Sequence, residues 1–309
     1  VSNDNGKQIN MNKSNKGVIL ALITALLWGV LAVALKVAVK KVDSFTIVWI
    51  RFVMAFSVLF IWFLITDKSQ LRILIKPSWE LVVATLGLSI NYIGFMLGVK
   101  YTSPSNAQVI IQIGPVLLAI AGIFLFHEKV RKIQIVGFSV VIIGFFLFYY
   151  QQLRGMFFDH SDFNKGSILT IIAAITWAVY AIMQKKLVKK YPPQTLNLFL
   201  YGLPTLLYLP FAKFSTLGSL SIGWWSLLAF LGANTLIAYG CMNASLKYID
   251  ANKVSAILIN NPIITFLIMA VLTVMNVDWI APEKFTPLAW TGALMFLIGA
   301  FLVVKAGNK

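Results

Sequence analysis

Charged residues are scarce in this chain of 309 residues, and acidic ones are the scarcest. Only 12% of residues are charged, with 26 Lys and Arg against 10 Asp and Glu, whereas a soluble domain carries about 25%. Because 59% of residues are hydrophobic, we expect lipid to surround most of the chain. The net charge of +16 does not predict a nucleic-acid partner, since the cations lie in short connections between apolar runs, where they set membrane topology.

Residues that build disulfides, metal sites and common catalytic groups are also nearly absent. Cys241 is the single cysteine, so no disulfide framework can form, and the two histidines do not cluster with it. The sequence has no Ser-His-Asp grouping, HExxH or paired-Asp motif. We therefore expect no enzyme activity, no metal and no cofactor. The polar segment 1–16 leads into an apolar run too long for a signal-peptide core, which predicts an uncleaved anchor.

Ten apolar runs are long enough for membrane helices, which need about 20 residues. Ser103-Pro104 separates two of them as a helix N-cap followed by Pro in the first turn. Pro204 and Pro210 make the seventh run the weakest. The fold class predicted is all-α integral membrane with ten transmembrane helices, at 17–37, 45–65, 80–99, 103–125, 130–149, 166–187, 195–214, 224–246, 251–275 and 286–305.

Lys and Arg in the connections predict the orientation of these helices. With the N-terminus inside, 17 of them face the cytoplasm and 8 face outwards, and Arg51 lies within a span. This bias predicts that both termini are cytoplasmic and that the protein is a multi-pass protein of the bacterial inner membrane. The outward cluster Lys36, Lys40 and Lys41 runs against the trend.

The two halves of the chain repeat each other. Segment 16–41 falls on segment 165–190 after a shift of 149 positions, and Trp28 and Lys36 coincide with Trp177 and Lys185. Further matches follow, at Lys100-Tyr101 and Lys247-Tyr248, Pro115 and Pro262, Gly137 and Gly292, and Gly144 and Gly299. Matches of Trp, Pro, Gly and Lys in register indicate a duplication rather than shared hydrophobicity.

A repeat of five helices places the second copy upside down, because five is an odd number of crossings. Inverted repeats are a recurrent architecture of secondary transporters, with the substrate site near the midplane between the halves. We therefore expect alternating access. The predicted domains are a cytoplasmic tail at 1–16, a first repeat at 17–150, a loop at 151–165, an inverted second repeat at 166–305 and a C-terminal tail at 306–309.

These features together resemble the drug/metabolite transporter superfamily, and its EamA-type family most of all. The resemblance covers about residues 16–305 and includes the run 113–147. Members of that family carry a Pro midway along the fourth helix of each half, a Glu just after that helix, and a Gly-rich fifth helix; here these are Pro115, Glu128, Gly137 and Gly144. The second half keeps Pro262, Gly292 and Gly299, while its Glu is displaced to Glu283. The resemblance implies a carrier fold and leaves the solute open.

Arg51 is the one cation well inside a predicted span, about 9 Å from the helix end by helical rise. A charge at such depth costs roughly 2.5–3.5 kcal/mol on insertion scales. Its side chain could clamp an anion or carboxylate in the cavity, or it could brace a neighbouring helix. Leu200 stands at the corresponding position of the second half, so the charge breaks the repeat.

Aromatic and amide side chains at mid-membrane depth are the other candidate substrate ligands. Trp28 and Trp177 lie too deep for interfacial anchors, and Tyr180 and Gln184 follow Trp177 on about the same helical face. Pro115 and Pro262 are predicted helix breaks with a role in gating. Amide bonds between helices are the alternative role for this set. The remaining candidates are Asn91, Tyr92, Gln108, Gln112, Tyr239, Asn243, Asn260 and Asn261.

A cavity lined by Trp, Tyr, Asn and Gln with one Arg suits a small zwitterionic or amine solute, such as an amino acid. A nucleoside or purine fits nearly as well, and a lipid or lysolipid flippase is a further alternative on the same fold; an inverted-repeat channel is also possible. Every acid and both histidines fall in loops or at helix ends, which favours a facilitator or exchanger over carboxylate-based proton coupling. The expected partners are a small-molecule solute and membrane lipid, with no nucleic acid, in a monomer or homodimer.

Overall fold

The computed structural model describes residues 2–128, 131–158, 162–283 and 286–306, and every regular element within them is helical. The first half forms α1 (Ser2–Ala38), α2 (Ser44–Thr66), η1 (Lys68–Leu74), α3 (Trp79–Tyr101), α4 (Pro104–Ile110), α5 (Ile113–Phe124) and α6 (Lys132–Phe158). The second half forms α7 (Asp162–Leu187), α8 (Pro193–Tyr208), η2 (Leu209–Phe211), η3 (Phe214–Thr216), α9 (Ile222–Tyr248), α10 (Ala251–Leu258), α11 (Asn261–Val274) and α12 (Pro287–Ala306).

Seven helical segments in the described part of the chain are long and apolar enough to cross a membrane. They are α2, α3, α7, α9, the part of α1 from Lys13, and the two broken helices α4–α5 and α10–α11. In α6 the apolar stretch among the described residues is Lys132–Phe148. α8 stops at Tyr208 because Pro210 follows and the chain continues as the 3₁₀ turn η2. The ten spans expected from the sequence therefore stay a prediction.

Helices extend beyond the apolar runs at two places. α1 begins at Ser2, within the segment predicted to be a polar tail. α6 continues to Phe158 and α7 begins at Asp162, so most of the predicted loop 151–165 is helical. Gln, Leu, Arg and Met after position 150 are good helix formers, so α6 continues where its apolar run ends.

Two helices break near their middle, each just before a proline. The first break separates α4 from α5 before Pro115, where Gly114 N donates to Ile111 O at 2.9 Å. The second separates α10 from α11, where Ile263 N donates to Asn260 O at 3.1 Å. Both bonds span three residues instead of four, because proline has no N–H to continue the α-helical ladder. The predicted breaks at Pro115 and Pro262 are therefore present.

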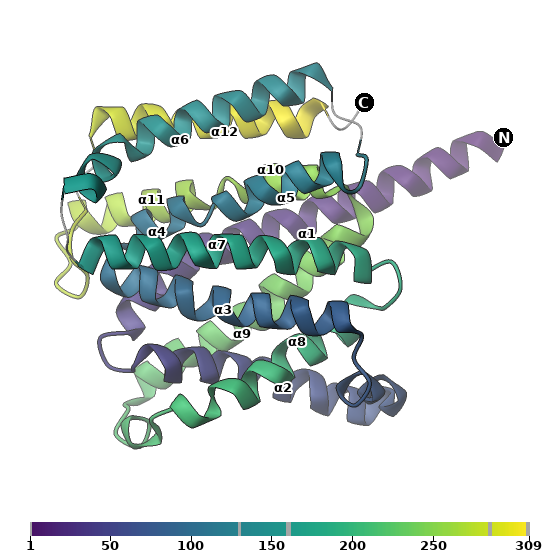
Figure 1. Cartoon of the computed structure of the whole chain (residues 1–309), viewed down its shortest axis with the longest axis horizontal. Helices are drawn as coiled ribbons and strands as arrows, with labels where there is room; N and C mark the ends of the chain where they lie inside the picture. Colours follow the sequence, from purple (N-terminus) through teal and green to yellow (C-terminus); the bar gives the residue numbers. More distant parts are fainter. Residues whose placement is uncertain (1, 129–130, 159–161, 284–285, 307–309) are drawn as a thin grey trace.

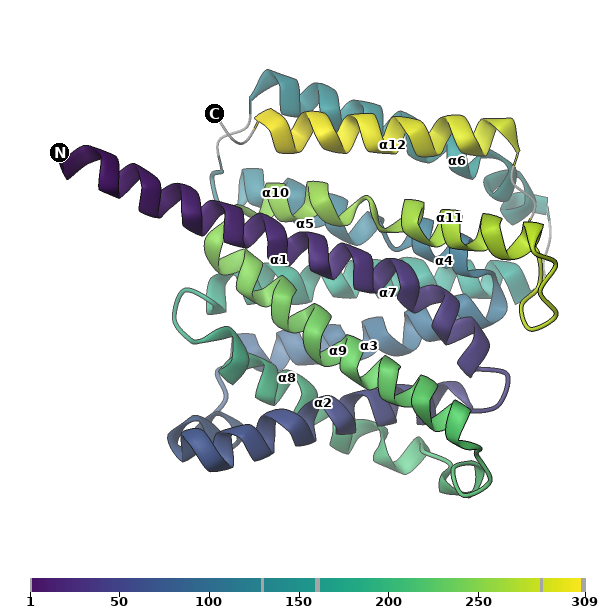
Figure 2. The same ribbon diagram turned by 180° about the vertical axis from the view of Figure 1, so that it is seen from behind.

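The helices pack as pairs drawn from the two halves. In Figures 1 and 2, α2 and α8 form one side of the bundle, α6 and α12 form the opposite side, and the broken helices run between them. α3 packs along α7, and α1 crosses α9. Glycines let the backbones approach: a Cβ added to Gly292 would lie 2.5 Å from the backbone N of Phe148, and one on Gly299 would lie 2.6 Å from Gly137 O.

Candidate functional site

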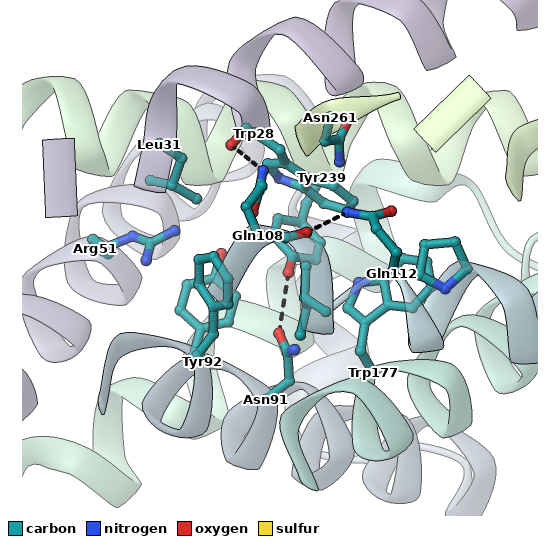
Figure 3. Close-up of a pocket in the computed structure, with 13 residues that line it drawn as sticks. Trp28, Leu31, Arg51, Asn91, Tyr92, Gln108, Gln112, Trp177, Tyr239 and Asn261 are labelled. Atoms are coloured by element: carbon teal, nitrogen blue, oxygen red, sulfur yellow. Dashed lines mark hydrogen bonds between the residues drawn. The ribbon is translucent and has the colours of Figure 1, made fainter. Parts of the chain in front are cut away.

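A cavity lies inside the bundle where helices of both halves meet. Its empty volume is about 510 Å³, including the space at its opening, and side chains leave it narrow. Its walls come from α1, α2, α3, α4, α5, α7, α9 and α11, and Figure 3 shows the lining side chains. They are Trp28, Leu31, Arg51, Asn91, Tyr92, Phe95, Gln108, Ile111, Gln112, Pro115, Trp177, Tyr239 and Asn261.

Aromatic residues at corresponding positions of the two halves meet in this cavity. The rings of Trp28 and Trp177 pack edge to face with centroids 5.9 Å apart. Tyr92 and Tyr239, which lie 147 positions apart like Lys100 and Lys247, have ring centroids 5.5 Å apart. Offset and edge-to-face contacts of this kind each add about 0.5–1.5 kcal/mol beyond area burial. They give the cavity a rigid aromatic wall.

Amide side chains form a second wall, and hydrogen bonds fix their orientation. Gln108 Nε2 donates to Trp28 O at 2.8 Å, and Gln112 Nε2 donates to Gln108 O at 2.9 Å. Asn91 Nδ2 donates to Ala173 O at 3.0 Å, and Tyr239 OH lies 3.5 Å from Asn91 Oδ1. These bonds join both halves around the cavity (Figure 3).

Arg51 is 2% exposed and is held by neutral groups. Its Nε donates to Thr235 Oγ1 at 3.0 Å, and its guanidinium carbon lies 4.4 Å from the centroid of the Tyr92 ring. Among the described residues, no carboxylate lies within ion-pair distance of it. A buried cation is expensive without a counter-charge, and this guanidinium lines the cavity, where an anionic group of a solute could supply one.

Buried polar atoms of the cavity wall without a hydrogen-bond partner in the described protein include one donor, Trp28 Nε1, and two acceptors, Gln112 Oε1 and Asn261 Oδ1. Buried polar groups are nearly always hydrogen-bonded, so these atoms are candidate partners for a solute in the cavity. The cavity thus offers a cation, one N–H donor and two carbonyl acceptors within aromatic walls.

Most of the predicted site residues line this cavity, but five lie elsewhere. Tyr180 OH donates to Asn243 Oδ1 at 2.6 Å, and Asn243 in turn donates to Asn197, which ties α7, α9 and α8 together. Asn260 Nδ2 bonds to Ala256 O and Ile257 O across its own helix break. Gln184 is fully buried outside the lining, and Pro262 follows the break without facing the cavity.

Three lining residues, Leu31, Phe95 and Ile111, were not predicted from the sequence. Apolar side chains in a membrane chain carry no local signal that separates a cavity wall from a lipid-facing surface. Leu31 lies three residues, or about one helical turn, after Trp28. This spacing places it on the same helical face as a predicted lining residue and could have identified it.

Comparison with known proteins gives relatives over nearly the whole chain. The inner membrane transporter YhbE of Escherichia coli K12, whose function is uncharacterised, is 33% identical over 287 residues, covering 92% of this chain and 89% of that protein. An uncharacterised transporter of Haemophilus influenzae is 31% identical over 292 residues, covering 93% and 94%. A protein of Salmonella typhimurium named as a probable amino-acid metabolite efflux pump is 25% identical over 306 residues, covering 94% and 95%.

The fold also has a counterpart among solved structures. One crystal structure matches with a TM-score of 0.72 and 19% identity, covering 95% of this chain and 98% of the other. The profile of the EamA-like transporter family matches residues 15–150 and again residues 164–305. The helical architecture, the matches in both halves and the relatives agree, and the chain belongs to the EamA-like transporter family.

Proposed function

We propose that this protein carries amino acids or related zwitterionic or amine metabolites across the bacterial inner membrane by alternating access, as a facilitator or exchanger. The observation that carries the proposal is Arg51, a buried cation without a carboxylate partner on the wall of a cavity between the two halves. A solute carboxylate would pair with the guanidinium, and an ammonium group would find Gln112 Oε1 and the aromatic faces. The name of the Salmonella relative is in keeping with this solute class.

The proposed architecture is ten membrane-spanning helices in two inverted repeats, with both termini in the cytoplasm. The two separate matches to the family profile support a duplication. The contact of Trp28 with Trp177 supports an axis that relates the halves through the cavity. In this architecture α6, α8 and α12 also cross the membrane, and each broken helix with its two parts counts as one span.

Counterflow in proteoliposomes tests the proposed solute class. Vesicles that hold the purified protein and an unlabelled amino acid should accumulate the labelled amino acid saturably, whereas a channel would not saturate. Arg51→Gln should abolish this counterflow but leave that of the matching decarboxylated amine within about twofold, because only the carboxylate needs the guanidinium. Equal loss for both solutes would remove Arg51 from the carboxylate site, and the absence of counterflow for every amino acid would overturn the solute class.

Whether transport is coupled to proton movement can be tested separately. Among the residues that the structure describes, no Asp, Glu or His lines the cavity, so none of the described lining side chains can take up a proton near neutral pH. We expect amino-acid uptake into proteoliposomes to leave the internal pH unchanged, as read by an entrapped pH dye. Proton movement in step with the solute would contradict a facilitator or exchanger.

A lipid flippase is the second candidate, because an apolar groove opens beside the cavity. The groove lies between α5 and α6 and shares Gln112 with the cavity. It contains about 570 Å³ of empty space and is lined by Gln112, Ile113, Val116, Leu117, Val141, Ile142, Phe145 and Phe146. An acyl chain could lie there with its head group near Gln112. Flipping of a fluorescent lysolipid, blocked by Ile142→Trp, would favour this function over amino-acid transport.

A further inference from the structure

The connections that precede the two broken helices are each held by a lysine from the same half of the chain. Lys36, in the last turn of α1, donates to the carbonyl oxygens of Val99 and Thr102 at 2.9 and 2.6 Å, and also to Lys100 O. Lys185, at the corresponding position of α7, donates to Leu246 O at 3.0 Å and to Ile249 O at 2.7 Å. The acceptors of the two lysines also stand at corresponding positions of the two halves, because Leu246 and Ile249 lie 147 positions after Val99 and Thr102.

A glutamate from the opposite half then reaches the start of each broken helix. The carboxylate of Glu128 accepts from Ala251 N at 2.7 Å and from Asn252 N at 3.0 Å, and it lies 3.9 Å from Lys185 Nζ. Glu283 Oε1 accepts from Ser105 N at 3.4 Å. Glu128 and Glu283 are 155 residues apart, the spacing that also relates Gly137 to Gly292. They are therefore equivalent, although the insertion in the second half obscures this in the sequence.

The two constellations lie at opposite ends of the bundle. Figure 1 places the start of α4 and the loop after α11 at one end, and the start of α10 and the end of α5 at the other. At each end the glutamate of one half bonds to the backbone of the other half, next to the connection that the lysine of that other half holds. Charge-assisted bonds to backbone N–H groups are about twice as strong as neutral ones.

We propose that Glu128 with Lys185 and Glu283 with Lys36 are paired locks, one at each end of the cavity, and that transport proceeds by releasing one while the other holds. The inference rests on the alternating-access mechanism proposed above. Opening either end must separate a glutamate of one half from the helix start of the other. The repeat explains why the same device occurs twice.

The two locks differ in the number of backbone bonds, and Pro104 accounts for this difference. Pro104 stands where the second half has Ala251. Proline has no N–H, so Glu283 accepts one backbone bond at the start of α4, whereas Glu128 accepts two at the start of α10. The Glu283 end therefore has one backbone bond fewer, and we expect the protein without solute to open at that end first.

Distances between pairs of spin labels at the two ends test the proposal without any solute. In a Cys241→Ser background, labels at exposed Lys100 and Asp278 report the Glu283 end, and labels at exposed Lys132 and Lys247 report the Glu128 end. Glu128→Gln should raise the open-to-closed ratio at its own end about tenfold, and Glu283→Gln should do so at the other. Glu80→Gln, at the start of α3 and outside both locks, is the matched control.

A variant that adds a hydrogen bond at the Glu283 end tests the proposal in the opposite direction. Pro104→Ala supplies the missing N–H donor and should shift the Lys100–Asp278 distances towards the closed population. Unchanged distances in both glutamine variants, or opening of the same end in both, would overturn the locks, and so would a Pro104→Ala variant that opens the Glu283 end. Because no solute is present, these outcomes stand apart from those of the counterflow experiment, which tests the solute class.

Discussion

Single residues in this bundle divide into those that face the cavity and those that hold helices together. Gln112 and Asn243 are both buried amides, yet Gln112 Oε1 has no hydrogen-bond partner while Asn243 bonds to Tyr180 and Asn197. The carbonyl oxygen of the Gln112 amide is therefore available to a solute, whereas the amide of Asn243 is bonded to the protein.

Alanine variants of these two amides should separate binding from stability. Gln112→Ala should weaken amino-acid binding about tenfold with little change in melting temperature, because one solute bond is lost. Asn243→Ala should lower stability by about 1–3 kcal/mol, since the buried hydroxyl of Tyr180 loses its acceptor. Its affinity for the amino acid should stay unchanged. Calorimetric titration and thermal melting of both purified variants measure the two effects. Equal effects of both variants on affinity would contradict the assignment of Gln112 to solute binding and of Asn243 to helix packing.

Glu283 should make stability depend on pH. Its burial raises the pKa of its carboxyl group above the ordinary value of 4.5, and this effect outweighs the opposing hydrogen bonds from Ser105 and Ser103 and the charge of Lys36. The folded protein therefore binds this proton more tightly than the unfolded chain does, so the contribution of Glu283 to stability falls as pH rises above 4.5 and levels off beyond the raised pKa.

The comparison with Glu283→Gln isolates this dependence. The melting temperature of the natural protein minus that of the variant should be largest near pH 4.5 and should shrink towards pH 7. Melting curves in detergent over this range measure the difference, in which other titrating groups largely cancel. A difference that stays constant with pH would show that burial does not shift the pKa of this carboxyl group.

At the scale of elements, glycine and proline decide how the helices pair and where they break. α6 and α12 approach closely because Gly292 lies against the backbone of Phe148 and Gly299 lies against Gly137. Without strong hydrophobic attraction between helices in lipid, such close contact supplies much of their association.

A leucine at one of these glycines should push the pair apart. Gly292→Leu should lower stability by about 1–3 kcal/mol or more, because a Cβ would already lie 2.5 Å from a backbone atom that cannot yield. Gly223→Leu is the control, since nothing lies within 4 Å of an added Cβ in the first turn of α9. Thermal unfolding in detergent compares the two, and equal melting temperatures would contradict this packing.

At the scale of the whole molecule, the two halves contact each other through residues at corresponding positions. Lys16 lies 5.3 Å from the Tyr248 ring, and Lys165 lies 4.9 Å from the Tyr101 ring, so corresponding lysines meet corresponding tyrosines. Such reciprocal contacts, like those of the two tryptophans, are expected when two similar halves pack about a twofold axis.

Labelling of intact cells tests whether the halves are antiparallel. In a Cys241→Ser background, a membrane-impermeant maleimide should label Lys165→Cys from outside and should reach Lys16→Cys only after the cells are opened. Both positions are exposed, so access depends on the side of the membrane alone. Labelling of both from one side would mean parallel halves and would remove the basis for alternating access.

The membrane class, the proline breaks and the family were predictable from the sequence, because each depends on composition or on residues in register along the chain. The sequence could not say which polar residues face the cavity. Trp177, Tyr180 and Gln184 share a helical face, yet only Trp177 lines the cavity. Helical spacing gives the direction of a side chain but not the neighbouring helix that it meets. Tertiary packing alone decided whether a buried amide meets another helix or open space, and it alone joined Glu283 to Ser105 across 178 residues.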